Sequence, residues 1–128
     1  MKHEFTARVY YEDTDMAGIV YHANYLKFIE RARSEMVRAA GIDQLALKAG
    51  GLVFAVRRIE ADFLRPAQYG DDLTVVTETR DLTGARFVLR QEVWRADEML
   101  FGATVTLAML NRAGRAARMP ADIRRAFG

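Results

Sequence analysis

Residues 9–25 decide the fold of this chain, and they read VYYEDTDMAGIVYHANY. An apolar stretch runs into three carboxylates, those of Glu12, Asp13 and Asp15, and a glycine-containing turn follows. From about His22 the apolar residues recur at three- and four-residue spacing, which predicts a long amphipathic helix. The turn therefore places acidic side chains next to a helix N-terminus, where the first N–H groups have no partner within the helix and carry partial positive charge.

A carboxylate beside a helix N-terminus can take part in the hydrolysis of a carbonyl compound. An ionised carboxylate can attack a carbonyl that the free N–H groups polarise, or it can activate water against that carbonyl. The segment is therefore a candidate hydrolase site made from one local stretch of chain. Alternation from Tyr11 predicts that Asp13 and Asp15 lie on one side and Glu12 on the other, with Asp13 shaping the turn or pairing with an arginine.

The rest of the pattern predicts an α+β protein. Short connections between the later strands favour antiparallel pairing, and the single long apolar helix needs a sheet to cover it. The expected elements, in chain order, are a strand over 5–11, a turn over 12–20, a helix over 22–40, a short helix over 43–48, strands over 52–64, 73–79, 87–93 and 101–109, and a final helix over 121–127.

The opening segment resembles the hotdog-fold thioesterases of the 4-hydroxybenzoyl-CoA thioesterase type. Within them it is most similar to the YbgC-like branch of small acyl-CoA thioesterases associated with the bacterial Tol–Pal system. The resemblance implies an antiparallel five-stranded sheet wrapped around one central helix, assembled as a dimer or a dimer of dimers, that is, a homotetramer. The residues that carry it are Tyr11–Asp15, Gly18, Val20–Tyr25 and Glu30–Arg33.

Asp15 and His22 are the catalytic candidates that the resemblance implies. Asp15 matches the catalytic acid, and an ordinary aspartate is already ionised at pH 7, as a base or nucleophile requires. The alternative is a turn aspartate that accepts a hydrogen bond from its own backbone. For His22 the resemblance implies that the backbone N–H near this position polarises the thioester carbonyl, while the imidazole could protonate the leaving thiolate or orient water.

Four further residues of the segment are candidates for substrate binding. Gly18 permits unusual backbone dihedrals and a close approach of substrate. Glycine is also favoured at this position in a turn that has no role in binding. Tyr11, Tyr21 and Tyr25 could line an acyl pocket, and Tyr25 also belongs to the apolar stripe of the helix, which indicates core packing.

The phosphates of CoA require cations near the mouth of the pocket. Relatives place basic residues around the hairpin between the third and fourth strands, but this chain has Thr83 where some of them carry a basic residue. Arg86, and Arg118 before a proline, are the candidates that remain. The segment from Arg112 to the C-terminus holds five arginines and one acid, which is either a solvated tail or a phosphate-attracting rim.

Length and composition are those of one globular domain over residues 1–128. The 51% hydrophobic and 28% charged residues argue against disorder, and the net charge of +2 is too small to indicate nucleic-acid binding. The chain has no cysteine and no metal-ligand spacing, so we expect neither a disulfide nor a metal or other cofactor. No signal peptide or apolar run of membrane-spanning length is visible, which predicts a cytoplasmic protein.

Two other functions are alternatives to hydrolysis. A hydratase or dehydratase acting on acyl-carrier thioesters would need a different pairing of histidine and acid. A non-enzymatic or weakly active partner of an acyl carrier protein or of an envelope complex would use the basic C-terminal segment to bind an acidic carrier.

Overall fold

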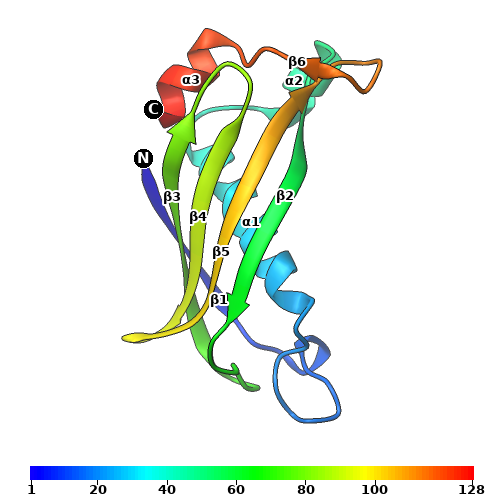
Figure 1. The fold of residues 1–128 in the computed structure, drawn as a ribbon. Helices are drawn as coiled ribbons and strands as arrows, with labels where there is room; N and C mark the ends of the chain where they lie inside the picture. Colours follow the sequence, from blue (N-terminus) through cyan, green and yellow to red (C-terminus); the bar gives the residue numbers. More distant parts are fainter.

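One antiparallel sheet curves around one long helix in the computed structural model, which describes residues 1–128 (Figure 1). This is the α+β arrangement that the sequence predicts. The elements are β1 (Lys2–Arg8), the 3-10 turn η1 (Tyr11–Asp13), α1 (Asn24–Ala39), α2 (Gln44–Ala49), β2 (Val53–Phe63), β3 (Asp72–Leu82), β4 (Phe87–Arg95), β5 (Glu98–Leu110), β6 (Ala116–Ala117) and α3 (Ala121–Phe127).

The five long strands lie in the order β1-β3-β4-β5-β2, and every pairing is antiparallel. A sixth strand, β6, adds two residues beside the end of β5, where Met109 faces Ala117. The sequence does not predict β6, because a two-residue strand has no periodicity of its own. The order leaves β1 and β2 at the two edges of the sheet, with one side of each backbone unpaired.

The apolar stripe of α1 forms the centre of the core, as its spacing predicts. Tyr25, Phe28, Ile29, Ala32 and Met36 are all buried against the sheet. Fully burying one large apolar side chain stabilises a fold by about 1.5–3 kcal/mol, so this face holds α1 in place more strongly than helix propensity does. None of the three helices is long and apolar enough to cross a lipid bilayer.

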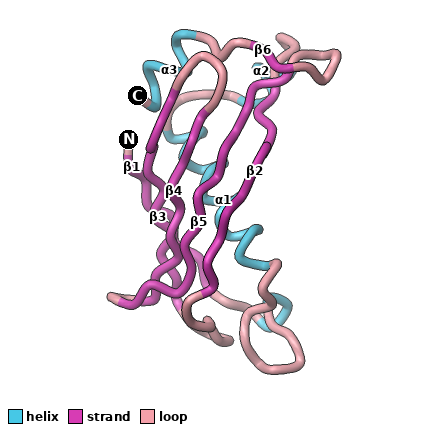
Figure 2. Tube along the Cα trace, viewed as in Figure 1, coloured by secondary structure: helices cyan, strands magenta, loops and turns pink.

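The two ends of the molecule carry different parts of the chain (Figures 1 and 2). The loop before α1 lies at one end, together with the connection between β2 and β3 and the β4–β5 hairpin. The β3–β4 hairpin lies at the other end with α2, β6 and α3. Since α1 runs between the two ends, about 24 Å of helix at 1.5 Å per residue separates them.

Candidate active site

Asp13 anchors the loop to the start of α1. Its side chain is only 6% exposed, and its two carboxylate oxygens accept hydrogen bonds from the Tyr10 N–H (2.8 Å) and the Asn24 side-chain amide (2.8 Å). Its backbone carbonyl accepts the Tyr21 N–H at 2.9 Å. The prediction that Asp13 shapes the turn is confirmed. The prediction that the first strand runs to Tyr11 and that Asp13 shares a side with Asp15 is wrong, because residues 11–13 form a 3-10 turn that directs Asp13 inward.

Asp15 is exposed, and its backbone closes a tight loop around Gly18. The Asp15 N–H donates to the Ile19 carbonyl, and the Asp15 carbonyl accepts the Gly18 N–H, each at 3.0 Å. Gly18 has φ +78°, the left-handed conformation that glycine adopts at low cost. One carboxylate oxygen of Asp15 accepts the Ala17 N–H at 2.9 Å, and the other has no protein partner. The Asp15 side chain therefore takes part in the turn through one oxygen and leaves the other oxygen free.

The start of α1 leaves two backbone donors free. The N–H groups of His22 and Ala23 donate to no protein acceptor, and no side chain caps the helix. The first bond of the helical turn is the Asn24 N–H to the Tyr21 carbonyl at 2.8 Å. The helix begins at Asn24, two residues later than predicted, so that His22 and its N–H lie in the loop. Free N–H groups at this place can polarise a carbonyl oxygen.

An apolar cavity of about 260 Å³ opens beside these donors. Asp15 is not among its lining residues, but Ile19, which the Asp15 N–H contacts across the loop, is one of them. The His22 ring meets the Phe63 ring edge to face, with centroids 6.0 Å apart. The cavity wall consists of Ile19, Val20, His22, Tyr25, Phe63, Leu64, Arg65 and Pro66.

Tyr25 lines the cavity and also belongs to the core. Its ring stacks on Phe101 at 5.0 Å, and its hydroxyl oxygen accepts the Ala67 N–H at 3.0 Å. Burial raises the pKa of the Tyr25 phenol, and the hydrogen bond from Ala67 only partly offsets this. The phenol therefore stays neutral at pH 7 and acts as a wall rather than as a base.

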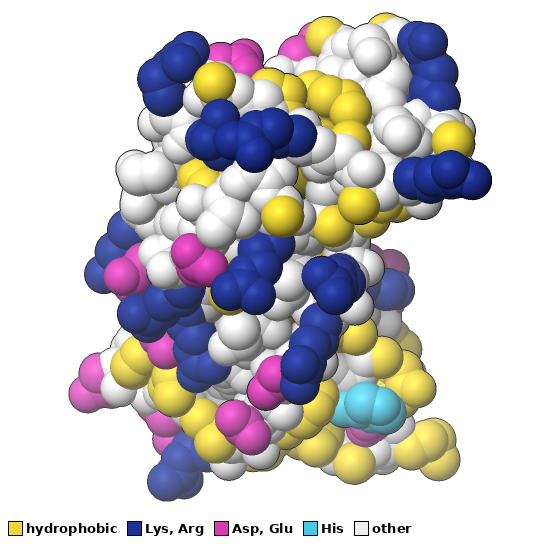
Figure 3. All heavy atoms as spheres, turned by 45° about the horizontal axis from the view of Figure 1, so that its top comes forward, with side chains coloured by type: hydrophobic (Ala, Val, Ile, Leu, Met, Phe, Trp, Pro, Cys, Tyr) yellow, Lys and Arg dark blue, Asp and Glu magenta, His cyan; other side chains and the backbone are white.

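The structure separates some of the predicted binding residues from this cavity. Tyr11 is 84% exposed and does not line it, and Tyr21 is about half exposed, with its ring against that of His22. Arg86 and Arg118 lie at the opposite end of the molecule, where Arg86 pairs with Asp81 at 3.1 Å. The Lys and Arg side chains are spread over the face shown in Figure 3 rather than gathered at one mouth. Within one chain, therefore, neither arginine is placed to contact a substrate at the Asp15 loop.

Arg118 and the β3–β4 hairpin do lie together. The Gly84 carbonyl accepts the Met119 N–H at 2.8 Å, and the Arg118 guanidinium lies over Gly84, where a Cβ atom would come within 2.5 Å of it. Arg86 and Arg118 are thus brought to one end of the sheet as a pair of cations.

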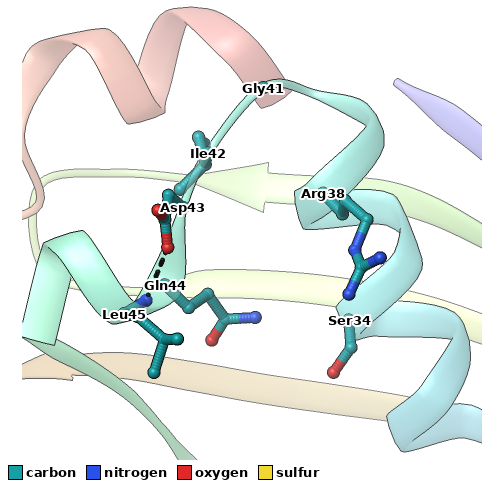
Figure 4. A pocket seen from close by; sticks show the side chains of 7 residues that line it. All are labelled: Ser34, Arg38, Gly41, Ile42, Asp43, Gln44 and Leu45. Carbon is teal, nitrogen blue, oxygen red and sulfur yellow. Dashed lines mark hydrogen bonds between the residues drawn. The ribbon is translucent and has the colours of Figure 1, made fainter.

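A larger hollow of about 510 Å³ lies at the corner between α1 and α2 (Figure 4). Arg38, Ser34 and Gln44 border it, and Asp43 is occupied as the cap of α2, accepting the Leu45 N–H at 2.9 Å. Ser34 donates its hydroxyl to Glu30 at 2.9 Å. Only two of its seven lining residues, Ile42 and Leu45, are apolar, so this hollow lacks the apolar wall that an acyl group needs.

Sequence reasoning missed the far wall of the apolar cavity. Phe63 ends β2, and Leu64, Arg65 and Pro66 follow it; all four come to the cavity only through the fold. The signal available for Phe63 was its place at the end of a predicted strand, which does not tell whether the ring faces a core or a pocket. Asn24 was also missed as a partner of Asp13, although a polar residue at the start of a helix commonly makes a local hydrogen bond.

Comparisons with known proteins show which family this chain belongs to. A family model described as the thioesterase superfamily (4HBT) matches residues 17–101. The chain belongs to the thioesterase superfamily. It is 40% identical over 102 residues to the acyl-CoA thioester hydrolase YbgC of Escherichia coli, which covers 80% of this chain and 76% of that protein. It is 42% identical over 108 residues to the acyl-CoA thioesterase YbgC of Haemophilus influenzae, covering 84% and 79%.

A solved structure of a superfamily member matches along nearly the whole chain. The probable thioesterase from Bartonella henselae is 44% identical, with a TM-score of 0.90 over 94% of this chain and 100% of that one. The predicted hotdog fold is confirmed. Thioesterase chemistry, the addition of water to a thioester carbonyl, is the reaction that an acid and free N–H groups can carry out without a metal ligand set.

Proposed function

We propose that this protein hydrolyses acyl-CoA thioesters to a free acid and CoA, with Asp15 as the base or nucleophile. The observation that carries the proposal is one loop holding three things together. These are a carboxylate with a free oxygen at Asp15, two unpartnered N–H groups at His22 and Ala23, and an apolar cavity beside them. The names of the relatives supply the class of substrate.

Two routes are consistent with this arrangement. In the first, Asp15 takes a proton from water, the resulting hydroxide adds to the thioester carbon, and the C–S bond breaks with the thiolate leaving. In the second, Asp15 adds to the carbon itself, expels the thiolate and forms an anhydride that water then hydrolyses. In both, the N–H groups of residues 22 and 23 stabilise the negative charge on the carbonyl oxygen. A single turnover in isotopically labelled water detects the second route when water adds to the Asp15 carbonyl of the anhydride, because the labelled oxygen then stays in Asp15, whereas the first route never labels it.

The basic test is thiol release from a panel of acyl-CoA substrates by the purified chain. Hydrolysis of at least one member at a rate well above the uncatalysed rate supports the proposal. No hydrolysis of any member by the folded protein contradicts it. Because CoA thioesters are formed inside the cell, the same proposal places the enzyme in the cytoplasm.

We also propose that a second copy pairs along β2. This edge strand has eleven residues, its backbone is unpaired on one side, and Val56 and Phe63 expose 47% and 53% of their surface. Two copies related by a two-fold axis would pair β2 antiparallel, which brings the Val53 end of one strand beside the Phe63 end of the other. The α2 and β6 end of the partner would then lie near the cavity. Light scattering distinguishes this dimer from a monomer and from a homotetramer built from two such dimers.

The paired arrangement changes the prediction for Arg86 and Arg118. Arg118→Ala is expected to raise KM for acyl-CoA about tenfold and to change kcat little, since a phosphate contact binds ground state and transition state alike. Arg86→Ala is expected to have a smaller effect, because Asp81 already neutralises that guanidinium. Kinetics on acyl-CoA and on a short thioester without the nucleotide provide the measurement. Equal losses on both substrates would instead show that the arginines support the fold.

Mixed dimers test whether these cations act across the interface. A dimer of one Asp15→Asn chain and one Arg118→Ala chain should recover about half of the wild-type efficiency, because one of its two sites then has both residues intact. If Arg118 serves the site of its own chain, the mixed dimer stays as weak as its parents.

His22→Ala is expected to have a milder effect than loss of Asp15. The backbone N–H survives the substitution, and the exposed imidazole makes no hydrogen bond in the protein. We expect kcat to fall by less than the ~100-fold typical of a lost general acid. Steady-state kinetics with a circular-dichroism check of folding are the measurement, and complete inactivation of a folded variant would show that the imidazole itself transfers a proton.

A further inference from the structure

Arg33 is a partly buried cation on α1 that forms no ion pair. Of the eight salt bridges in the protein, none includes it. Burial lowers the pKa of the Arg33 guanidinium, and the nearby Glu30 only partly opposes this. Holding a charged group out of water without a counter-charge is costly, so such a group gains strongly when an anion arrives.

A buried amide fixes the direction of this guanidinium. Arg33 donates from Nη1 to the Gln91 Oε1 at 2.9 Å. Gln91 is itself completely buried and donates its NH2 group to the Ile29 carbonyl and to the Thr77 hydroxyl oxygen, each at 2.9 Å. These bonds use the donors of Gln91 and leave its oxygen only for Arg33. Because both polar atoms of the Gln91 side chain are hydrogen-bonded, the amide is held rigidly and fixes the position of the Arg33 Nη1.

The guanidinium borders a small cavity of about 180 Å³, and four of the eight lining residues are apolar. Glu30 is the other charged residue of the lining, and one of its oxygens accepts the Ser34 hydroxyl. Only one of the five N–H donors of Arg33 is used, so the remaining fork is available to a planar, bidentate acceptor. The lining residues are Glu30, Arg33, Ser34, Val37, Gln44, Phe54, Val56 and Leu107.

This cavity and the one beside the Asp15 loop lie on the same flank of α1. Tyr25 and Phe63 border the first, and Arg33 and Phe54 border the second, so each lies between α1 and the edge strand β2. Tyr25 and Arg33 are eight residues apart, about 12 Å along the axis at ~1.5 Å per residue. Helical side chains lean toward the N-terminus, which brings the guanidinium closer to the Asp15 loop than its Cα atom.

We propose that Arg33 binds the terminal carboxylate of a dicarboxylic acyl group whose thioester lies at the Asp15 loop. The inference rests on the proposed thioesterase function and names the class of acyl group that this chain prefers. A carboxylate matches the planar fork of a guanidinium and supplies the missing counter-charge.

The experiment compares suberyl-CoA with octanoyl-CoA, two acyl groups of equal carbon number that end in a carboxylate and in a methyl group. The wild type is expected to have the higher kcat/KM for suberyl-CoA. In Arg33→Met the ratio of the two values should fall at least tenfold, and Arg33→Lys should lie between, since lysine keeps the charge without the fork. Arg31→Met is the matched control, because Arg31 lies on the same helix, is exposed and forms no ion pair.

The outcomes separate this inference from the proposed function. If the wild type hydrolyses octanoyl-CoA but not suberyl-CoA, or if Arg33→Met lowers both values equally, the carboxylate subsite is wrong and the thioesterase stands. Equal losses together with dissociation of the dimer would show that Arg33 pairs with a carboxylate of the second copy instead. If the wild type hydrolyses neither substrate nor any other acyl-CoA, the proposed function itself fails.

Discussion

Asp15→Asn is expected to lower kcat for acyl-CoA hydrolysis at least ~100-fold while the protein stays folded. The amide cannot accept a proton from water at neutral pH and cannot attack a thioester. The side-chain carbonyl of asparagine can still accept the Ala17 N–H, so the loop around Gly18 should keep its shape. Thiol release measures the activity, and thermal unfolding confirms that the fold is unchanged.

Glu12→Gln is the matched control for this result. Glu12 is an exposed carboxylate in the same loop, with no hydrogen bond or ion pair in the structure. Its removal changes the local charge by the same amount as removal of Asp15, and we expect kcat to stay close to that of the wild type. Near-wild-type turnover of a folded Asp15→Asn protein would overturn the mechanism, and an equal loss in both variants would point to the charge of the loop rather than to Asp15.

Asp13→Ala is expected to lower the free energy of unfolding by about 2–4 kcal/mol, since it leaves two hydrogen-bond donors without their acceptor. These donors are the Tyr10 N–H and the Asn24 side-chain amide, and the site is nearly closed to solvent. Because Asp13 ties the loop to the start of α1, turnover should fall along with stability. Urea unfolding at a fixed protein concentration measures the effect, as a dimer makes stability depend on concentration.

Asn24→Ala provides the internal control for the Asp13 anchor. It removes one of the two side-chain bonds to Asp13 and leaves the bond from the Tyr10 N–H intact, so its cost should be about half as large. If Asp13→Ala unfolds at the same urea concentration as the wild type, the anchor does not hold the loop. In that case the position of Asp15 must depend on the short bridges of the loop, such as Thr14 to Val20.

The elements of this fold could be predicted because their signals are local. The apolar spacing of Tyr25, Ile29 and Met36 indicates which face of α1 is buried, and that face is buried in the structure. The alternation in β5 and the capping of α2 by Asp43 are equally local and are equally well reproduced. Periodicity and turn chemistry act between residues a few positions apart, so they can be read without knowing the fold.

The candidate site could be predicted only in part. The loop with Asp15, Gly18 and the start of α1 is one continuous segment, and in the structure it holds a free carboxylate oxygen on Asp15 and free N–H groups at His22 and Ala23. The direction of Asp13 could not be predicted, since it depends on its contact with Asn24 eleven residues later and on a 3-10 turn in place of a strand.

By itself, the sequence determined the type and order of the long elements and the loop that brings acid and helix together. The tertiary structure decided which distant residues meet. It places Phe63 against His22 at the cavity, Gln91 behind Arg33, and Arg86 and Arg118 at the far end of the sheet from Asp15. The physical reason is that local patterns record which face of an element is apolar. The partners of that face follow from how strands separated by tens of residues pair around α1, and no local spacing encodes that pairing.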